Sequence, residues 1–115
     1  LIIAVPNSNS YDARFYKNFW AAYDVPRHIW HFNFYQMKLL GEKHGLQLKG
    51  IKKMPFDTFY ISILSEKYKR AKIPIIKGAI RGKISWCLSL FDQKKCSSLI
   101  FIFKKAQPAN ATLLD

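Results

Sequence analysis

A chain of 115 residues is long enough for one domain of modest size and too short for two. Because half of its residues are apolar and 16% are aromatic, the composition excludes an intrinsically disordered polypeptide. Nineteen lysines and arginines against seven acidic residues give a net charge of +12, which indicates an anionic partner and carries no information about the fold.

The first five residues form a short apolar run, which the turn-forming residues 6–10 close. A run of this length predicts a strand that is buried on both faces, as in a parallel sheet. The sequence starts inside this strand and without an initiator methionine, so we expect that an N-terminal part of a longer protein has been removed.

Three further features of the sequence bear on the cellular compartment. The apolar start lacks the basic segment of a signal peptide, and no stretch of about 18 apolar residues predicts a membrane-spanning helix. Cys87 and Cys96 match neither a disulfide framework nor a metal-binding spacing, and Cys87 is expected to be a free, buried thiol. Together these features predict a cytoplasmic protein.

The middle of the chain predicts an α/β unit. Residues 12–20 can form a short helix, and the segment 24–27 breaks it, because proline disfavours a helical residue before it. A clearer helix follows Asn33, a good N-cap, and ends at Gly45. Alternation of apolar and polar residues over 46–51 then predicts a half-exposed strand. Helix, glycine and strand belong together as one unit.

Two more helices and one strand complete the predicted elements. Asp57 is expected to cap the first helix, and Pro74 marks the restart of the chain before the second helix over 75–91. The last strand covers residues 98–103. Residues 106–115 are expected to form a flexible tail.

The helix over 75–91 combines an apolar face with basic residues. The apolar face carries Ile76, Ile80, Ile84, Cys87, Leu88 and Phe91. With Trp86 as an interfacial anchor, Lys77, Arg81 and Lys83 suit a helix that lies on an anionic membrane surface, which would make the protein membrane-peripheral. The alternative is an ordinary amphipathic helix that covers the sheet or a subunit interface and leaves its lysines in water.

Two segments, Val5-Pro6-Asn7 and the Tyr-Asp-Val-Pro-Arg-His-Ile-Trp-His-Phe sequence at 23–32, resemble the middle of class I S-adenosylmethionine-dependent methyltransferases of the type 11/12/23 group. In that group a fifth strand ends in Pro-Asn, and a Pro-Arg-His-x-x-x-Phe segment precedes a helix that ends in glycine. The similarity covers roughly residues 1–70 and is weaker from there to the end.

The resemblance implies an α/β fold: part of a Rossmann-like methyltransferase sheet with three to four helices. Its strands would correspond to the fifth, sixth and seventh strands of the family, of which the seventh runs antiparallel between the other two. Residues 1–105 would form the C-terminal half of the domain, and the helices at about 57–91 would be an insertion between the sixth and seventh strands.

The cofactor of that family is S-adenosylmethionine, and the resemblance places its binding elements outside this chain. Those enzymes use a glycine-rich loop after the first strand and an acidic residue at the end of the second. The five glycines of this sequence are scattered and form no Gly-x-Gly motif. We therefore expect no cofactor-binding residue in this chain, negligible binding of S-adenosylmethionine, and no activity of the chain alone.

Candidate site residues follow from the rule that ligands of open α/β sheets bind beyond the carboxyl ends of the strands. Asn7, Arg27 and Trp30 are predicted to contact the methyl acceptor, with Arg27 suited to a carboxylate or phosphate. His28 or His31 is predicted to act as the general base. The alternative is structural: Arg27 pairs with Asp24 or a helix end, and the histidines bond to the backbone.

The aromatic residues around this segment also allow two interpretations. Trp20, Tyr23, Trp30 and Phe32 would either line a substrate site or pack the helix onto the sheet. A metal site is not expected, because no Asp, Glu or Cys at a suitable spacing completes a set with the histidines at 28 and 31.

The predicted function is the acceptor-substrate side of a methyltransferase whose acceptor is a small molecule, a lipid or a saccharide. The alternative is a basic module without catalysis that binds nucleic acid or an anionic membrane, or that dimerises. Nucleic acid is the less favoured partner, because the aromatic residues lie away from the basic cluster. A homodimer is expected through residues 1–5, since an unpaired strand edge invites association.

Overall fold

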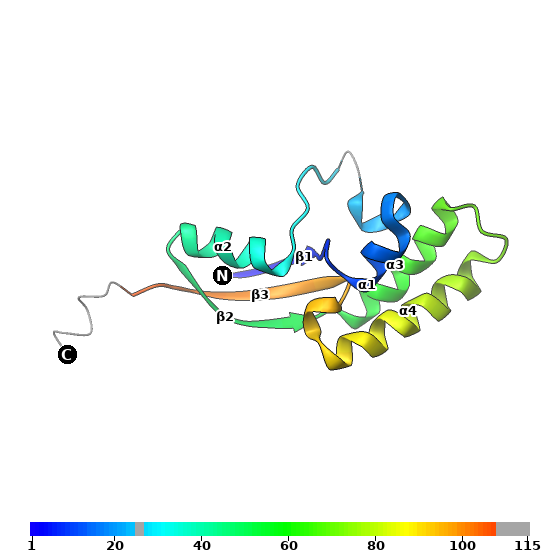
Figure 1. Cartoon of the computed structure of the whole chain (residues 1–115). Coiled ribbons are helices and arrows are strands. Elements are labelled where there is room, and N and C mark those ends of the chain that lie inside the picture. Colours follow the sequence, from blue (N-terminus) through cyan, green and yellow to red (C-terminus); the bar gives the residue numbers. More distant parts are fainter. Residues whose placement is uncertain (25–26, 108–115) are drawn as a thin grey trace.

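The computed structural model describes residues 1–24 and 27–107, without the side chain of Pro55. Its elements are β1 (Ile2–Pro6), α1 (Tyr11–Tyr16), η1 (Lys17–Phe19), η2 (Ala21–Tyr23), α2 (Phe34–Lys43), β2 (Leu46–Lys53), α3 (Pro55–Tyr68), α4 (Pro74–Phe91), η3 (Gln93–Lys95) and β3 (Ser98–Lys105). The sheet and α2 form one half of the molecule, and α1, α3 and α4 form the other (Figure 1). Residues 25–26 of the predicted break and 108–115 of the predicted tail lie outside the described residues.

The three strands form one sheet with β3 in the centre. β1 pairs antiparallel with β3 from Ile2–Ile102 to Pro6–Ser98, and β2 pairs antiparallel with β3 on its other side. β1 and β2 therefore run in the same direction, and their carboxyl ends lie where β3 begins. The structure confirms a mixed α/β architecture and the central, antiparallel position of the last strand.

The first strand differs from its sequence-based expectation. The apolar run predicted a strand buried on both faces in a parallel sheet, whereas β1 is an edge strand whose partner is antiparallel. Its side chains alternate, so Ile3 and Val5 pack into the core of the sheet while Ile2 and Ala4 are exposed. A continuous apolar run thus corresponds here to a strand with one buried face.

Helix α2 covers one face of the sheet. Asn33 caps it, because its side chain accepts a hydrogen bond from the Gln36 N–H and the Gln36 side chain accepts one from the Asn33 N–H. Met37 packs with the central strand residues Leu99, Phe101 and Phe103 in a buried cluster. The helix after Asn33 is therefore confirmed.

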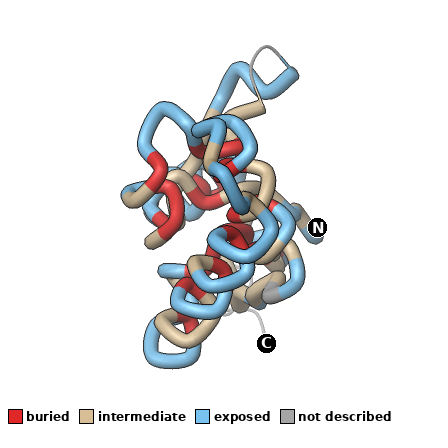
Figure 2. Tube along the Cα trace, turned by 90° about the vertical axis from the view of Figure 1, so that its right-hand side faces the viewer, coloured by how far each residue is buried: buried red, intermediate tan, exposed pale blue. Residues whose placement is uncertain are grey.

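A second core lies between α1, the two short 3-10 turns and α3. Its buried apolar members are Ala13, Tyr16, Trp20, Ala21, Ala22 and Ile61. The Trp20 indole N–H donates to the Asp12 carboxylate at 2.9 Å, and the Ser97 hydroxyl donates to the same oxygen at 2.7 Å. Because Asp12 and Ser97 are distant in sequence, these bonds connect α1 to the start of β3. Buried segments lie between the elements, and many outer helix turns are exposed (Figure 2).

Helices α3 and α4 form a hairpin that departs from the sequence prediction in two ways. The first helix begins at Pro55 with Met54 as its N-cap, so Asp57 lies in the first turn instead of capping it. The buried residues of α4 are small: Gly78, Gly82, Ser85 and Ser89. Gly78 and Gly82 lie directly against Ile63 and Phe59 of α3, whereas most of the predicted apolar face of α4 is exposed.

Candidate functional site

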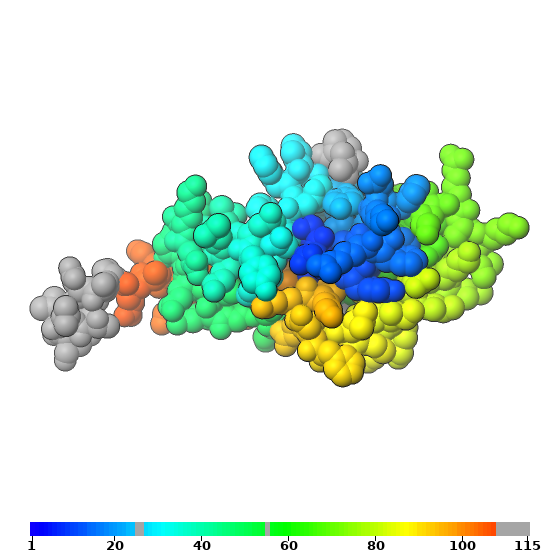
Figure 3. Space-filling model, in the orientation of Figure 1, coloured from blue at the N-terminus to red at the C-terminus, as the bar shows by residue number. Residues whose placement is uncertain are grey.

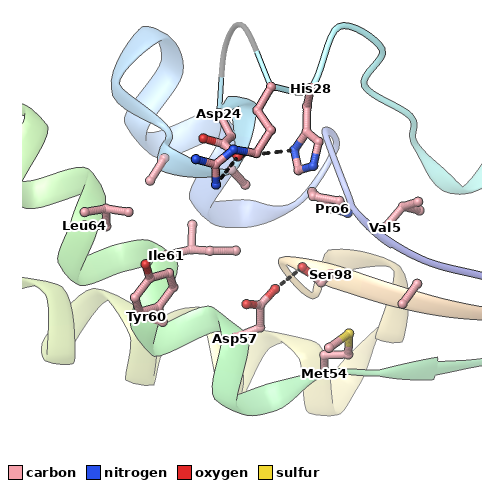
Figure 4. A pocket seen from close by; sticks show the side chains of 14 residues that line it. Val5, Pro6, Asp24, His28, Met54, Asp57, Tyr60, Ile61, Leu64 and Ser98 are labelled. Atoms are coloured by element: carbon pink, nitrogen blue, oxygen red, sulfur yellow. Dashed lines mark hydrogen bonds and ion pairs between the residues drawn. The ribbon is translucent and has the colours of Figure 1, made fainter.

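A cavity of about 330 Å³ opens at the end of the sheet where β1 finishes and β3 begins (Figure 4). One wall comes from the chain after η2, another from the first turns of α3, and the floor from the strand ends. The lining residues are Ala4, Val5, Pro6, Ala21, Ala22, Asp24, Arg27, His28, Met54, Asp57, Tyr60, Ile61, Leu64 and Ser98. The cavity therefore lies at the edge of the sheet where the sequence placed the functional residues.

Three charged or titratable side chains form the wall after η2. Asp24 is in the left-handed conformation (φ 44°, ψ 46°) that ends the 3-10 turn, and its carboxylate lies 3.6 Å from Arg27 Nη1 and 3.9 Å from His28 Nδ1. The His28 N–H donates to the Asp24 carbonyl at 2.9 Å, which connects the two residues through their backbones as well. An exposed ion pair contributes about 0–1 kcal/mol, so Asp24 aligns Arg27 and His28 without locking them.

The opposite wall carries three polar residues that the sequence prediction did not include in the site. The Asp57 carboxylate accepts a hydrogen bond from the Ser98 hydroxyl, which connects α3 to the beginning of β3. Tyr60, one turn further along α3, also lines the cavity. In Figure 4 these side chains lie across the opening from Asp24 and His28. A carboxylate placed four residues after a strand could have signalled this position.

His31 and Trp30 belong to a smaller adjoining cavity of about 130 Å³, which His28 also lines. The His31 ring lies edge-on against Tyr23, with centroids 4.8 Å apart, and its Nε2 lies 2.8 Å from the Tyr23 carbonyl oxygen. That oxygen can only accept, so the bond requires the proton on Nε2. The contact favours a positioning role for His31, whereas Trp30 is 79% exposed and free to contact a ligand.

Asn7 lines neither of these two cavities, because its side chain is buried under the loop before β3. Its amide donates to the carbonyls of Lys94 and Cys96 at 2.5 and 2.9 Å, and its Oδ1 accepts from the Asn9 N–H at 3.2 Å. With both amide hydrogens used by the backbone, Asn7 has the geometry of a residue that holds the end of β1 in place.

The predicted aromatic residues separate into core and surface. Trp20 is 1% exposed and belongs to the helical core, and Phe32 packs against the core of the sheet. The structural interpretation therefore applies to Trp20, whereas Phe32 both packs against the core and lines the smaller cavity. Within residues 1–24 and 27–107, no group of three or more His, Cys, Asp or Glu side chains is arranged to hold a metal ion.

Comparison with known proteins identifies no similar protein. No family model matches the chain, and neither a curated protein nor a solved structure matches it.

Proposed function

We propose that this chain forms the acceptor-binding side of an S-adenosylmethionine-dependent methyltransferase. The observation that carries the proposal is the strand order β1-β3-β2, with the last strand antiparallel between two strands of the same direction. This is the arrangement of the fifth, seventh and sixth strands in the family that the Val5-Pro6-Asn7 and 23–32 segments resemble. The cavity at the carboxyl end of β1 agrees with the position of ligand sites in open α/β sheets.

The family approaches its cofactor through a glycine-rich loop, and none of the glycines of this chain lines the 330 Å³ cavity or the adjoining one. Our proposal therefore assigns the residues that line these cavities to the methyl acceptor.

His28 is the residue best placed to take a proton from the acceptor. It lines both cavities, its side chain is 47% exposed, and Asp24 lies 3.9 Å from Nδ1, on the side of the ring away from Nε2. A neutral imidazole can accept the proton of a hydroxyl or amine as that atom becomes a nucleophile. Arg27, 82% exposed at the mouth, is suited to an anionic group of the acceptor.

The lining of the larger cavity favours an acceptor with an apolar part and a polar part. Ala21, Ala22, Ile61 and Leu64 give one apolar side, while Asp57, Tyr60 and Ser98 offer hydrogen-bonding groups. A volume of about 330 Å³ lies at the lower end of typical small-molecule sites. A small molecule, or the head group or terminal sugar of a lipid or saccharide, fits these dimensions.

The test is methyl transfer by the product of the complete reading frame that contains this chain. His28→Ala is expected to lower kcat by about 10²- to 10⁴-fold with a smaller change in the acceptor KM, because a general base acts in the transition state. His44→Ala, at the exposed end of α2, is the matched control and should retain wild-type kcat.

Two results would contradict the proposal at different levels. Wild-type kcat in the His28→Ala protein would contradict the role of His28 as the general base, but it would not contradict the family assignment. Failure of the complete protein to bind S-adenosylmethionine in a calorimetric titration would remove the family assignment itself. The second result would leave the basic, non-catalytic module as the remaining prediction.

A further inference from the structure

The outer side of α4 is an apolar surface that its packing turns away from the rest of the molecule. Ile76, Ile80 and Phe91 are 56%, 56% and 90% exposed, and Ile84 is 36% exposed. At 100° per residue these four side chains fall within one face about 80° wide, opposite the buried small residues. We name this face the α4 stripe; it consists of Ile76, Ile80, Ile84 and Phe91.

The contact between α3 and α4 explains why this face points outward. A Cβ at Gly78 would collide with the backbone of Ile63, and one at Gly82 would lie 2.7 Å from the Phe59 ring. The two helices therefore approach so closely that only small residues fit between them. The apolar residues of α4 are left on the opposite side, where their exposure in water costs free energy.

The charges within α4 have a single sign, and the exposed Asp92 follows directly after the helix. Between residues 67 and 91 the sequence contains seven basic residues and no acidic one. Lys77 and Lys83 flank the stripe on either side and are exposed. Arg81 does not belong to this set, because its guanidinium stacks on Phe15 at 3.9 Å and donates to the Tyr11 hydroxyl at 3.3 Å. This corrects the sequence-based grouping of Arg81 with Lys77 and Lys83.

These observations favour an anionic lipid surface over a second copy of the chain as the partner. Two copies that met at their α4 stripes would bring Lys77 and Lys83 of both copies close together, which opposes association at this face. An anionic bilayer instead accepts the apolar side chains and attracts the lysines. Among the described helices, none is long and apolar enough to cross a membrane. The geometry therefore suits a helix that lies in the plane of the surface.

We propose that α4 docks on an anionic membrane surface, with the α4 stripe inserted at the boundary of head groups and acyl chains and with Lys77 and Lys83 at the lipid phosphates. The helix forms the lower right flank of the molecule in Figure 3, coloured yellow-green to yellow, and is open to such a surface. The cavity lies on the other side of α3 (Figure 4), so docking leaves its opening free.

The experiment is co-sedimentation of the 115-residue chain with vesicles of phosphatidylcholine that contain roughly 30% phosphatidylglycerol or none, because the anionic lipid supplies the negative surface potential that attracts lysines. Binding is expected only with phosphatidylglycerol. Lys77→Glu/Lys83→Glu should weaken the partition coefficient by at least about tenfold. Lys104→Glu/Lys105→Glu changes the net charge equally at the far end of β3 and should weaken the partition coefficient much less.

A second pair of variants tests the apolar contact. Ile80→Ser should weaken binding to the vesicles more than Leu39→Ser, which changes an exposed apolar residue of α2.

The remaining outcomes overturn the proposal. Equal losses in the two lysine pairs would mean that only the net charge acts. A concentration-dependent dimer in sedimentation that Ile80→Ser abolishes would assign the stripe to a second copy. If this chain binds the vesicles and the complete protein does not, the α4 stripe is covered by another segment of the same protein. Circular dichroism of each variant verifies that α4 remains folded.

Discussion

At the scale of single residues, the buried polar pairs of the helical half hold elements together that are distant in sequence. Tyr16 and Glu66 are 2% and 4% exposed, and the Tyr16 hydroxyl donates to Glu66 Oε1 at 2.9 Å. The pKa of Tyr16 is raised far above its usual value of 10.0, first by burial and then by the hydrogen bond and the negative charge of Glu66. This pair connects α1 to α3 beside the candidate site.

Tyr16→Phe should destabilise the fold by about 1–3 kcal/mol, because it leaves the buried Glu66 carboxylate without this partner. The folded state holds the Tyr16 proton to higher pH than the unfolded state, so this stabilising contribution is complete below pH 10 and is lost as the pH rises above it. Urea denaturation at pH 7 and above pH 10 measures both effects. The control is Tyr68→Phe, which changes a partly exposed tyrosine of α3. An equal fall in stability above pH 10 in the wild type and in Tyr16→Phe would contradict the assignment of this pH effect to Tyr16.

The candidate site illustrates what residue patterns can and cannot predict. The segment around Arg27 and His28 was predicted to lie at the sheet edge, and the structure places both residues at the cavity. The sequence predicted Asp57 only as a helix cap and Ser98 only as a strand residue. Their shared place in the site could not be predicted, because their hydrogen bond joins positions 41 residues apart. Asn7 was predicted from a motif, while its role in the structure depends on carbonyl groups 87 and 89 residues away.

At the scale of elements, α4 shows how packing can reverse the apparent orientation of an amphipathic helix. Periodicity identified the apolar face correctly, and the usual expectation is that such a face is buried. The small residues at 78, 82, 85 and 89 form the buried face instead, since they allow the α3 backbone to approach. The beginnings of α2 and α4 were predictable from Asn33 and Pro74, whereas Asp57 was the wrong cap for α3. The choice between two possible packing faces depends on the neighbouring helix.

Gly78→Ala tests whether helix propensity or the close contact with α3 determines stability at this position of α4. Helix propensity alone predicts a gain of about 1 kcal/mol in the free energy of unfolding. The collision of the new methyl group with the Ile63 backbone predicts a loss of about 1–3 kcal/mol instead. Chemical denaturation measures the sign. Gly50→Ala, where nothing lies within 4 Å of the added atom, is the control and should not show this loss.

At the scale of the whole molecule, the described sheet has two edge strands, β1 and β2, and the edge at β1 is the more apolar one. β1 stands at the side of β3 and exposes Leu1, Ile2 and Ala4. Open backbone groups along an apolar edge favour pairing with another strand. In the proposed parent protein a further strand would occupy this edge.

The 115-residue chain is accordingly expected to self-associate through β1. Ala4→Lys places a charge on the edge strand and should shift the equilibrium toward monomer, whereas Ile80→Ser on the far side of α4 should not. Sedimentation equilibrium over a hundredfold range of concentration measures the association. A wild-type chain that remains monomeric throughout this range would show that the edge is inert.

The central position of β3 also has a kinetic consequence. Among the described residues, β1 and β2 share no backbone ladder with each other, and each pairs with β3, which follows both in the sequence. During synthesis neither strand can form its ladder with β3 until residues 98–105 follow. Sequence separations of up to about 100 residues make this closure slow. The nascent chain is therefore expected to depend on chaperones until its final strand arrives.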